Sequence, residues 1–185
     1  MRVYLTMKTD RAAAIACAER AMQRLERLGV SLLLLRKQAA VCSAPRSAVC
    51  VDTVEEGMRA CDAVVAIGGD GTIFHAAADA MRFEKPVLGI NAGRLGFLAQ
   101  AEGDDLSPLD RFAAGDSEIE RRLVLQAEVA RAGKTEIFYA VNDAVITNPD
   151  FGLISEIEVR CGGESVGSYR GDGIIFATPT GSTAY

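Results

Sequence analysis

An acidic residue flanked by glycines is the first place where this sequence can do chemistry. Asp70 lies between Gly69 and Gly71, directly after the apolar run at residues 63–67, and Thr72 follows. Such a run is typical of a buried parallel strand, and the N–H groups of the helix after a strand of this kind bind phosphate. Glycines let the backbone approach a phosphate closely because no Cβ intervenes.

The carboxylate of Asp70 indicates which reaction this phosphate-binding site could carry out. A carboxylate repels a phosphate unless it binds a magnesium ion or accepts a proton from a hydroxyl that attacks the phosphate. The combination of glycines and an acid therefore predicts phosphoryl transfer, with Asp70 either holding a magnesium ion or accepting the proton. The alternative is an Asp-Gly hairpin turn, but residues 72–81 have a helical pattern, which disfavours a hairpin. The chain contains neither a Walker A sequence nor G-x-G-x-x-G.

The residues around Asp70 predict alternating strands and helices. Strands are expected at residues 2–6, 30–35, 63–67 and 85–91, and helices at 54–62 and 72–81, with Thr72 available as a cap. Another helix is expected between a cap at Thr9 or Asp10 and Gly29, and residues 36–47 are expected to be a loop. This pattern predicts an α/β nucleotide-binding domain over residues 1–103, Rossmann-like and three-layered.

The pattern changes after residue 103. Residues 107–115 predict a short helix with Ser107 as its cap, and from Leu123 onward apolar and polar residues alternate, which indicates antiparallel strands. A hairpin turn is expected at residues 162–163. We therefore predict a β-rich domain of β-sandwich type over residues 104–185.

Composition excludes several classes of protein. The chain has 185 residues and a formal net charge of −5, so it has no general attraction for nucleic acid or an anionic membrane. Its longest aliphatic block near the N-terminus, residues 32–35, is far shorter than the roughly 18 residues of a membrane span, and no signal-peptide pattern is present, so we expect a cytoplasmic protein. Five cysteines and one histidine, without a C-x-x-C spacing, indicate neither a disulfide framework nor a zinc site, and we assign no residue to a metal.

The stretch GGDGT at residues 68–72 resembles the signature of a kinase superfamily that includes NAD kinases, diacylglycerol-type lipid kinases and phosphofructokinases. Three further stretches, PVLGINAGRLGFLA at 86–99, VNDAVI at 141–146 and YRGDGIIFATPTGSTAY at 169–185, are similar in kind and order to those of NAD kinases. The resemblance implies phosphoryl transfer from ATP or polyphosphate to the 2′-hydroxyl of the adenosine ribose of NAD, with Mg²⁺ accompanying ATP. It also implies a homodimer or homotetramer, and a β domain that is incomplete here because the family's β domain continues further.

The resemblance implies roles for the residues of the motifs. Asp70 would accept or orient the ribose hydroxyl, with helix capping as the alternative. Gly69 and Gly71 would admit the phosphates, and Thr72 would contact a phosphate or cap the helix. The remaining assignments each have an alternative. Asn142 and Asp143 would hold the ribose or form a turn, Arg170 would neutralise phosphate or pair with Asp172, and Phe97 would line the dinucleotide pocket or belong to the core. Asp172 would reach a dinucleotide on the neighbouring subunit. His75 would contact nucleotide or be structural or solvated, and Arg94 would contact a phosphate or be solvated at the surface. Thr183, Ala184 and Tyr185 would line the nicotinamide side.

Two other functions stay open from sequence alone. One is a lipid kinase of the same superfamily, which the stretches at 141–146 and 181–185 disfavour. The other is a dinucleotide-binding sensor without catalytic activity. A substrate comparison of NAD with diacylglycerol separates the first from an NAD kinase, and formation of NADP separates the second.

Overall fold

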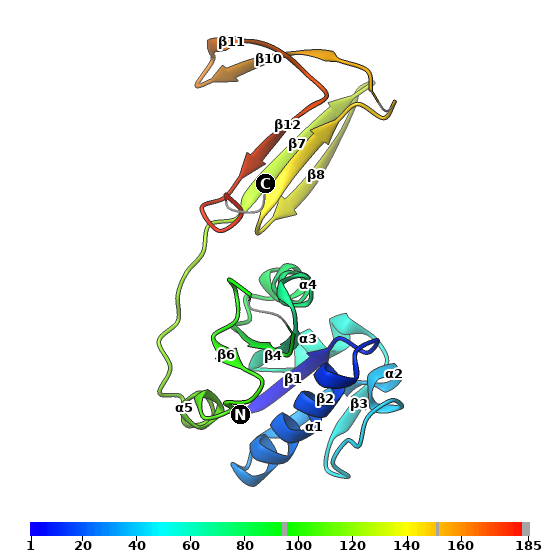
Figure 1. Cartoon of the computed structure of the whole chain (residues 1–185), viewed down its shortest axis with the longest axis vertical. Coiled ribbons are helices and arrows are strands. Elements are labelled where there is room, and N and C mark those ends of the chain that lie inside the picture. The colour runs from blue at the N-terminus through cyan, green and yellow to red at the C-terminus, as the bar shows by residue number, and fades with distance from the viewer. Residues whose placement is uncertain (94–95, 151, 183–185) are drawn as a thin grey trace. The chain divides into compact units, whose positions relative to one another are not determined.

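The computed structural model describes residues 1–93, 96–150 and 152–182, and the chain divides into two compact units, Met1–Glu120 (unit 1) and Arg121–Tyr185 (unit 2) (Figure 1). Unit 1 is built on a parallel sheet with the strand order β3-β2-β1-β4-β5-β6. Its strands are β1 (Arg2–Met7), β2 (Ser31–Leu35), β3 (Val49–Val51), β4 (Ala63–Gly68), β5 (Val87–Asn91) and β6 (Ala101–Glu102). Its helices are α1 (Ala12–Arg27), α2 (Arg36–Ala39), α3 (Val54–Ala60), α4 (Asp70–Met81) and α5 (Pro108–Ala114).

Helices cover both faces of this sheet. Consecutive strand residues point to opposite faces, so Leu5 of β1 packs in one core with Met22 of α1, while Tyr4 packs in the other with Met58 of α3 and Ile73 of α4. Every residue of β4 is buried, which explains its continuous apolar run. The predicted Rossmann-like, three-layer arrangement is confirmed.

The start of α1 differs from the sequence prediction. The helix begins at Ala12, and its N-cap is Arg11 rather than Thr9 or Asp10. The carbonyl of Arg11 accepts the first helical bonds, while the Asp10 carboxylate lies 3.3 Å from Lys8 Nζ. The expected cap is therefore wrong because its acid has another partner.

Residues 36–47 are not entirely a loop, because they begin with the single turn α2. A helix this short shows no period in the sequence, so the pattern could not reveal it. The expected helix ends are confirmed, since Gly29 (φ +74°) follows α1 and Gly115 (φ +71°) follows α5 in the left-handed conformation that glycine tolerates. None of the described helices is long and apolar enough to cross a membrane.

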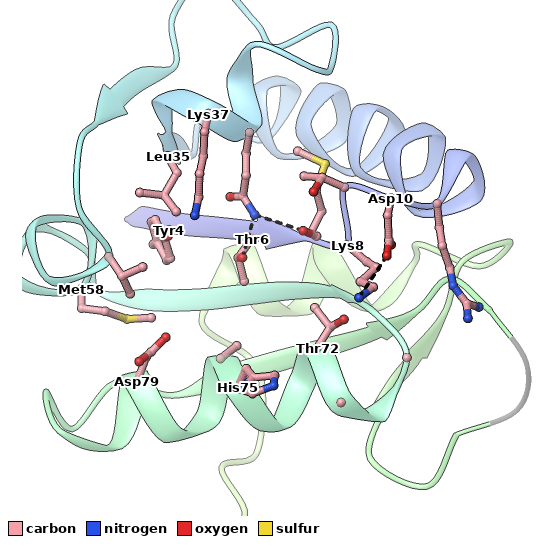
Figure 2. A pocket seen from close by; sticks show the side chains of 18 residues that line it. Tyr4, Thr6, Lys8, Asp10, Leu35, Lys37, Met58, Thr72, His75 and Asp79 are labelled. Carbon is pink, nitrogen blue, oxygen red and sulfur yellow. Dashed lines mark hydrogen bonds and ion pairs between the residues drawn. The ribbon is translucent and has the colours of Figure 1, made fainter.

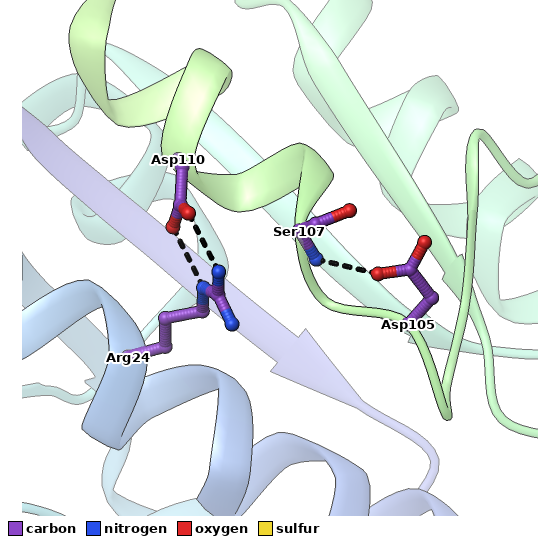
Figure 3. A network of polar contacts seen from close by, with 4 residues as sticks. All are labelled: Arg24, Asp105, Ser107 and Asp110. Carbon is purple, nitrogen blue, oxygen red and sulfur yellow. Dashed lines mark hydrogen bonds and ion pairs between the residues drawn. The ribbon is translucent and has the colours of Figure 1, made fainter.

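Helix α5 belongs to unit 1, so the division of the chain falls after Glu120 rather than after residue 103. Leu109 of α5 is completely buried in the core that α1 covers. Arg24 of α1 donates two hydrogen bonds, of 2.7 and 2.6 Å, to the Asp110 carboxylate (Figure 3). Ser107 is the N-cap but makes no side-chain cap bond, and its N–H instead donates to the Asp105 carboxylate at 2.9 Å. The change of sequence pattern thus marks the end of the sheet, whereas burial of Leu109 keeps the next helix in the same core.

Unit 2 consists of antiparallel strand pairs, as predicted. These are β7 (Leu125–Arg131) with β8 (Lys134–Ala140), β9 (Asp143–Thr147) with β12 (Gly173–Ala177), and β10 (Ser155–Cys161) with β11 (Glu164–Gly171). The expected hairpin at residues 162–163 is confirmed, because both glycines have positive φ and connect β10 to β11.

Candidate active site

The glycine-flanked acid lies at the junction of β4 and α4. Helix α4 begins at Asp70 and its N-cap is Gly69, whose carbonyl accepts hydrogen bonds from the N–H groups of Thr72 (2.9 Å) and Ile73 (3.2 Å). Thr72 therefore lies inside the first turn, and the prediction that it caps the helix is wrong. The N–H groups of Asp70 and Gly71 have no acceptor within the helix because of their position in its first turn. They are available to bind an anion.

Neither glycine beside Asp70 is required by the fold of this chain. A Cβ atom added to Gly69 or Gly71 would have no other heavy atom within 4 Å, and neither residue has a positive φ. By contrast, a Cβ at Gly68 would lie 2.8 Å from Thr72 Cβ, so Gly68 is explained by packing. Glycine at 69 and 71 is instead explained by a ligand that approaches the backbone closely.

Asp70 holds the loop that follows β5. Its Oδ2 accepts a hydrogen bond from the N–H of Phe97 (3.1 Å) and its Oδ1 accepts one from the N–H of Leu98 (3.3 Å). A Cβ added to Gly96 would collide with Oδ1, so the loop packs closely against the carboxylate. The carboxylate is half-buried and lies at the N-terminus of α4.

A cavity of about 590 Å³ opens beside the first turn of α4, and Gly69, Gly71 and Thr72 line it, whereas Asp70 does not (Figure 2). The cavity lies at the carboxyl ends of β1 and β4, which are neighbours in the sheet. The helices after these two strands, α1 and α4, cover opposite faces of the sheet. This is a topological switch point, where α/β proteins bind ligands.

The cavity brings together some of the predicted residues and several that sequence reasoning missed. Gly69, Gly71, Thr72 and His75 all line it, and His75 is exposed. The missed charged and amide residues of its wall are Lys8, Asp10, Arg11, Lys37, Gln38 and Asp79. Lys8, Asp10 and Arg11 follow β1, and Lys37 and Gln38 follow β2. Because ligands of α/β proteins bind at the carboxyl ends of the strands, the reasoning that identified the residues after β4 could also have found these.

The polar groups of the cavity differ in how well they are paired. Gln38 Nε2 donates to Met7 O (3.0 Å) and to Thr6 Oγ1 (3.1 Å). Gln38 Oε1 and the Tyr4 hydroxyl are buried without a partner among the described residues. Burial raises the pKa of the Tyr4 phenol, and the nearby Asp79 carboxylate raises it further.

In unit 2 the pair Asn142 and Asp143 lies against the segment that follows β12. The Asn142 amide donates to the Asp143 carboxylate. Thr178 is 1% exposed, and its hydroxyl donates to the carbonyls of Val141 (2.8 Å) and Asn142 (3.0 Å). A Cβ added to Gly181 would collide with the Asn142 carbonyl. Two of the motifs noted in the sequence are therefore packed together, and Asn142 also lies in the connection between β8 and β9.

The other predicted residues occupy varied positions. Phe97 is 85% exposed, so the alternative that it belongs to the core is wrong. Arg170 in β11 and the following Asp172 are both exposed, and the ion pairs of the described residues do not include one between them. The assignments of Arg94, Thr183, Ala184 and Tyr185 lie outside the described residues.

The strand order and the cavity at the switch point define an α/β protein of the nucleotide-binding class. The family model of the ATP-NAD kinase N-terminal domain matches residues 3–114, and that of the ATP-NAD kinase C-terminal domain matches residues 141–185. The chain therefore belongs to the ATP-NAD kinase family.

Individual relatives agree with this assignment. The chain is 40% identical over 185 residues to the NAD kinase of Symbiobacterium thermophilum and 37% identical over 186 residues to that of Chlorobium phaeovibrioides. These matches cover 98% and 100% of this chain but 64% of each relative. The chain thus spans about two thirds of the length of these relatives.

Two solved structures have the same fold. A yeast NADH kinase complexed with NADH gives a TM-score of 0.88 at 20% identity, over 100% of this chain and 59% of the other. An NAD kinase from Archaeoglobus fulgidus in complex with ATP gives 0.69 at 24% identity, over 100% of this chain and 64% of the other.

Proposed function

We propose that the protein is an NAD kinase, which transfers a phosphoryl group from ATP or polyphosphate to the 2′-hydroxyl of the adenosine ribose of NAD. The observation that carries the proposal is the pair of glycines at 69 and 71, which the fold does not require and which leave room for phosphates beside Asp70. Family membership supports the choice of NAD as acceptor. The kinase relatives complexed with NADH and with ATP support both substrates.

The chemical step follows from the position of Asp70. The ribose 2′-oxygen forms a bond to the terminal phosphorus of the donor, the bond from that phosphorus to the bridging oxygen breaks, and ADP or the shortened polyphosphate leaves. The hydroxyl proton goes to the Asp70 carboxylate. Because phosphoryl transfer passes through a loose transition state, positioning of the hydroxyl matters more than the basicity of the acid. The N–H groups at the start of α4 stabilise the charge on the transferred group.

A divalent cation would enter this site with the donor. No three acidic, histidine or cysteine side chains in residues 1–93, 96–150 and 152–182 come close enough to form a metal site of their own. Mg²⁺ is commonly held by substrate phosphates with one or two carboxylates. The residues present therefore fit a cation carried by the phosphates of ATP and do not form a separate metal cage.

We assign NAD binding to the residues that the family resemblance implies. Asn142 and Asp143 would hold the ribose hydroxyls, since a carboxylate can accept two hydrogen bonds from a vicinal diol. Asp172 would reach a dinucleotide on the neighbouring subunit of a homodimer or homotetramer, and Arg170 would neutralise phosphate; both residues are exposed. Phe97 offers an exposed aromatic face beside Asp70. Arg94 would contact a phosphate, and Thr183, Ala184 and Tyr185 would line the nicotinamide side of the dinucleotide.

The test compares NADP formation by the wild-type protein, Asp70→Asn and the control Asp104→Asn, which removes an exposed carboxylate that does not line the cavity. We expect Asp70→Asn to lose about 10²–10⁴-fold in rate and Asp104→Asn to retain the wild-type rate. Phosphorylation of diacylglycerol in place of NAD would establish the lipid kinase. Binding of NAD without NADP formation by the wild-type protein would establish the sensor and overturn the proposal.

A further inference from the structure

The loop between β5 and β6 has little strand pairing to fix it beside Asp70. Strand β6 has only two residues, and it pairs with the last two residues of β5. The loop nevertheless brings the N–H groups of Phe97 and Leu98 to the Asp70 carboxylate. Contacts other than the strand ladder therefore hold this part of the loop in place.

Gln100, at the end of this loop, makes such contacts through its side chain. Its Oε1 accepts a hydrogen bond from the N–H of the buried Gly89 in β5 (2.8 Å), and its Nε2 donates to the Leu98 carbonyl (2.6 Å). Exchanging the nitrogen and the oxygen would set donor against donor and acceptor against acceptor, so these two partners fix the orientation of the amide. The Gln100 side chain thus ties Leu98 to the sheet.

Leu98 is held at three points. Its side chain is 9% exposed and packs in the same core as Ile73 of α4. Its N–H donates to Asp70 Oδ1 at 3.3 Å, and its carbonyl accepts from Gln100. The N–H of the preceding Phe97 donates to Asp70 Oδ2 at 3.1 Å. A displacement of Leu98 would therefore move both of the N–H groups that the carboxylate accepts.

These two hydrogen bonds determine how the Asp70 carboxylate is oriented. One N–H group binds each oxygen, and each oxygen keeps a further acceptor direction that a substrate hydroxyl can use. In phosphoryl transfer the positioning of the hydroxyl matters more than the basicity of the acid. A misplacement of about 1 Å can lower a rate about 100-fold, so whatever orients this carboxylate affects the reaction.

We infer that Gln100 is a positioning residue for the phosphoryl transfer. By holding the Leu98 carbonyl, it presents the N–H groups of Phe97 and Leu98 to Asp70 and so orients the carboxylate that receives the hydroxyl proton. The inference rests on the proposed function and adds to it a residue that does not line the cavity. Because Gln100 acts through Asp70, its effect on the reaction requires the Asp70 carboxylate.

The test is a double-mutant cycle of NADP formation with Gln100→Met and Asp70→Asn. Gln100 is exposed, so the methionine removes its two side-chain hydrogen bonds without opening the core. We expect Gln100→Met alone to lower kcat about 10- to 100-fold and to change KM for ATP little. In the Asp70→Asn background the same change should have almost no effect, because no carboxylate is left to orient. A loss of equal size in both backgrounds would overturn the inference, since a general structural defect acts whether or not the acid is present.

Two more variants locate the effect at the Leu98 carbonyl. Gln100→Glu keeps an acceptor for the Gly89 N–H but sets an oxygen against the Leu98 carbonyl, so we expect it to lower kcat as Gln100→Met does. The control Gln23→Met makes the matched change at an exposed position of α1 and should retain the wild-type rate. A wild-type kcat for Gln100→Glu would overturn the inference.

Hydrogen exchange separates this inference from the proposed function. Gln100→Met should accelerate exchange of the Phe97 and Leu98 amides, and Gln23→Met should not. Unchanged exchange at both amides would overturn the inference while the kinase stands. If the wild-type protein forms no NADP, the kinase fails, and accelerated exchange would still show that Gln100 holds the loop against Asp70.

Discussion

Replacing Asp70 by Asn should loosen a loop as well as impair catalysis. The carboxylate accepts hydrogen bonds from Phe97 N–H at 3.1 Å and Leu98 N–H at 3.3 Å. An Asn side chain has a single oxygen and an amide that cannot accept, so it leaves one N–H group facing an NH₂ group. A lost bond to a charged acceptor costs about 1.5–3 kcal/mol, and the lost charge at the helix N-terminus costs about 0.3–1 kcal/mol. Because the site is half-exposed, we expect a total of about 2 kcal/mol.

Thermal unfolding measures this loss. At about 4 °C per kcal/mol for a domain of this size, Asp70→Asn should lower Tm by about 8 °C. Hydrogen exchange of the Phe97 and Leu98 amides should accelerate, while the amides of the buried strand β4 change little. The control Asp104→Asn should leave both measurements unchanged. An unaltered Tm and unaltered exchange at these two amides would show that the carboxylate does not hold the loop.

A second variant separates the two roles of Asp70. An alanine at position 96 would place its Cβ against Oδ1 of Asp70 and displace the loop while keeping the acid. We expect Gly96→Ala to accelerate exchange at the same amides and to retain more NADP formation than Asp70→Asn. Equal activity of the two variants would mean that loop position alone accounts for the loss.

Three further variants test the packing of unit 1, its stability at alkaline pH and its stability at acid pH. Gly57→Ala brings a Cβ to 2.6 Å from two ring carbons of the fully buried Tyr4. The overpacking costs about 1–3 kcal/mol and outweighs the gain in helix propensity of about 1 kcal/mol, so the urea midpoint of unfolding should fall. A higher midpoint would mean that the Tyr4 ring moves to make room. Above about pH 10 the wild-type protein should lose stability because Tyr4, whose pKa is raised on folding, ionises more readily in the unfolded chain. Tyr4→Phe should lack this part of the decline, and an identical alkaline profile would contradict the assignment. The Arg24 guanidinium lowers the pKa of the Asp110 carboxyl, so the pair stabilises the fold above about pH 4 and this contribution disappears as the pH falls further. The Tm difference between Arg24→Gln and wild type should therefore shrink below pH 4, and a constant difference would refute the ion-pair explanation.

Sequence patterns predicted the α/β unit because a strand buried on both faces has an unmistakable apolar run, as β4 does. They also located Gly69, Asp70 and Gly71 at the end of that strand. They missed Gln38 and Tyr4, because an amide and a phenol become informative only when burial and the lack of a partner are known.

The end of the α/β unit was misplaced for a related reason. Helix α5 follows the last strand of the sheet in sequence and resembles the start of a new domain. Its side chain Leu109 nevertheless packs into the core beside α1, and Arg24 binds Asp110. Contacts between residues so far apart in sequence leave no local pattern. The predicted cap at Asp10 was wrong because its carboxylate pairs with Lys8, and the predicted cap at Thr72 was wrong because α4 already begins at Asp70.

The hydrogen bonds of Asp70 constrain how this position can vary. A carboxylate has about four acceptor directions, and the backbone of residues 97 and 98 occupies two of them. A substrate hydroxyl can therefore bind without displacing the loop, so anchoring and proton acceptance coexist on one side chain. A mutation that removes the acid loses both at once. A second change that anchors residues 96–98 by other means would restore the loop but not proton acceptance, so recovery of both requires the carboxylate at position 70.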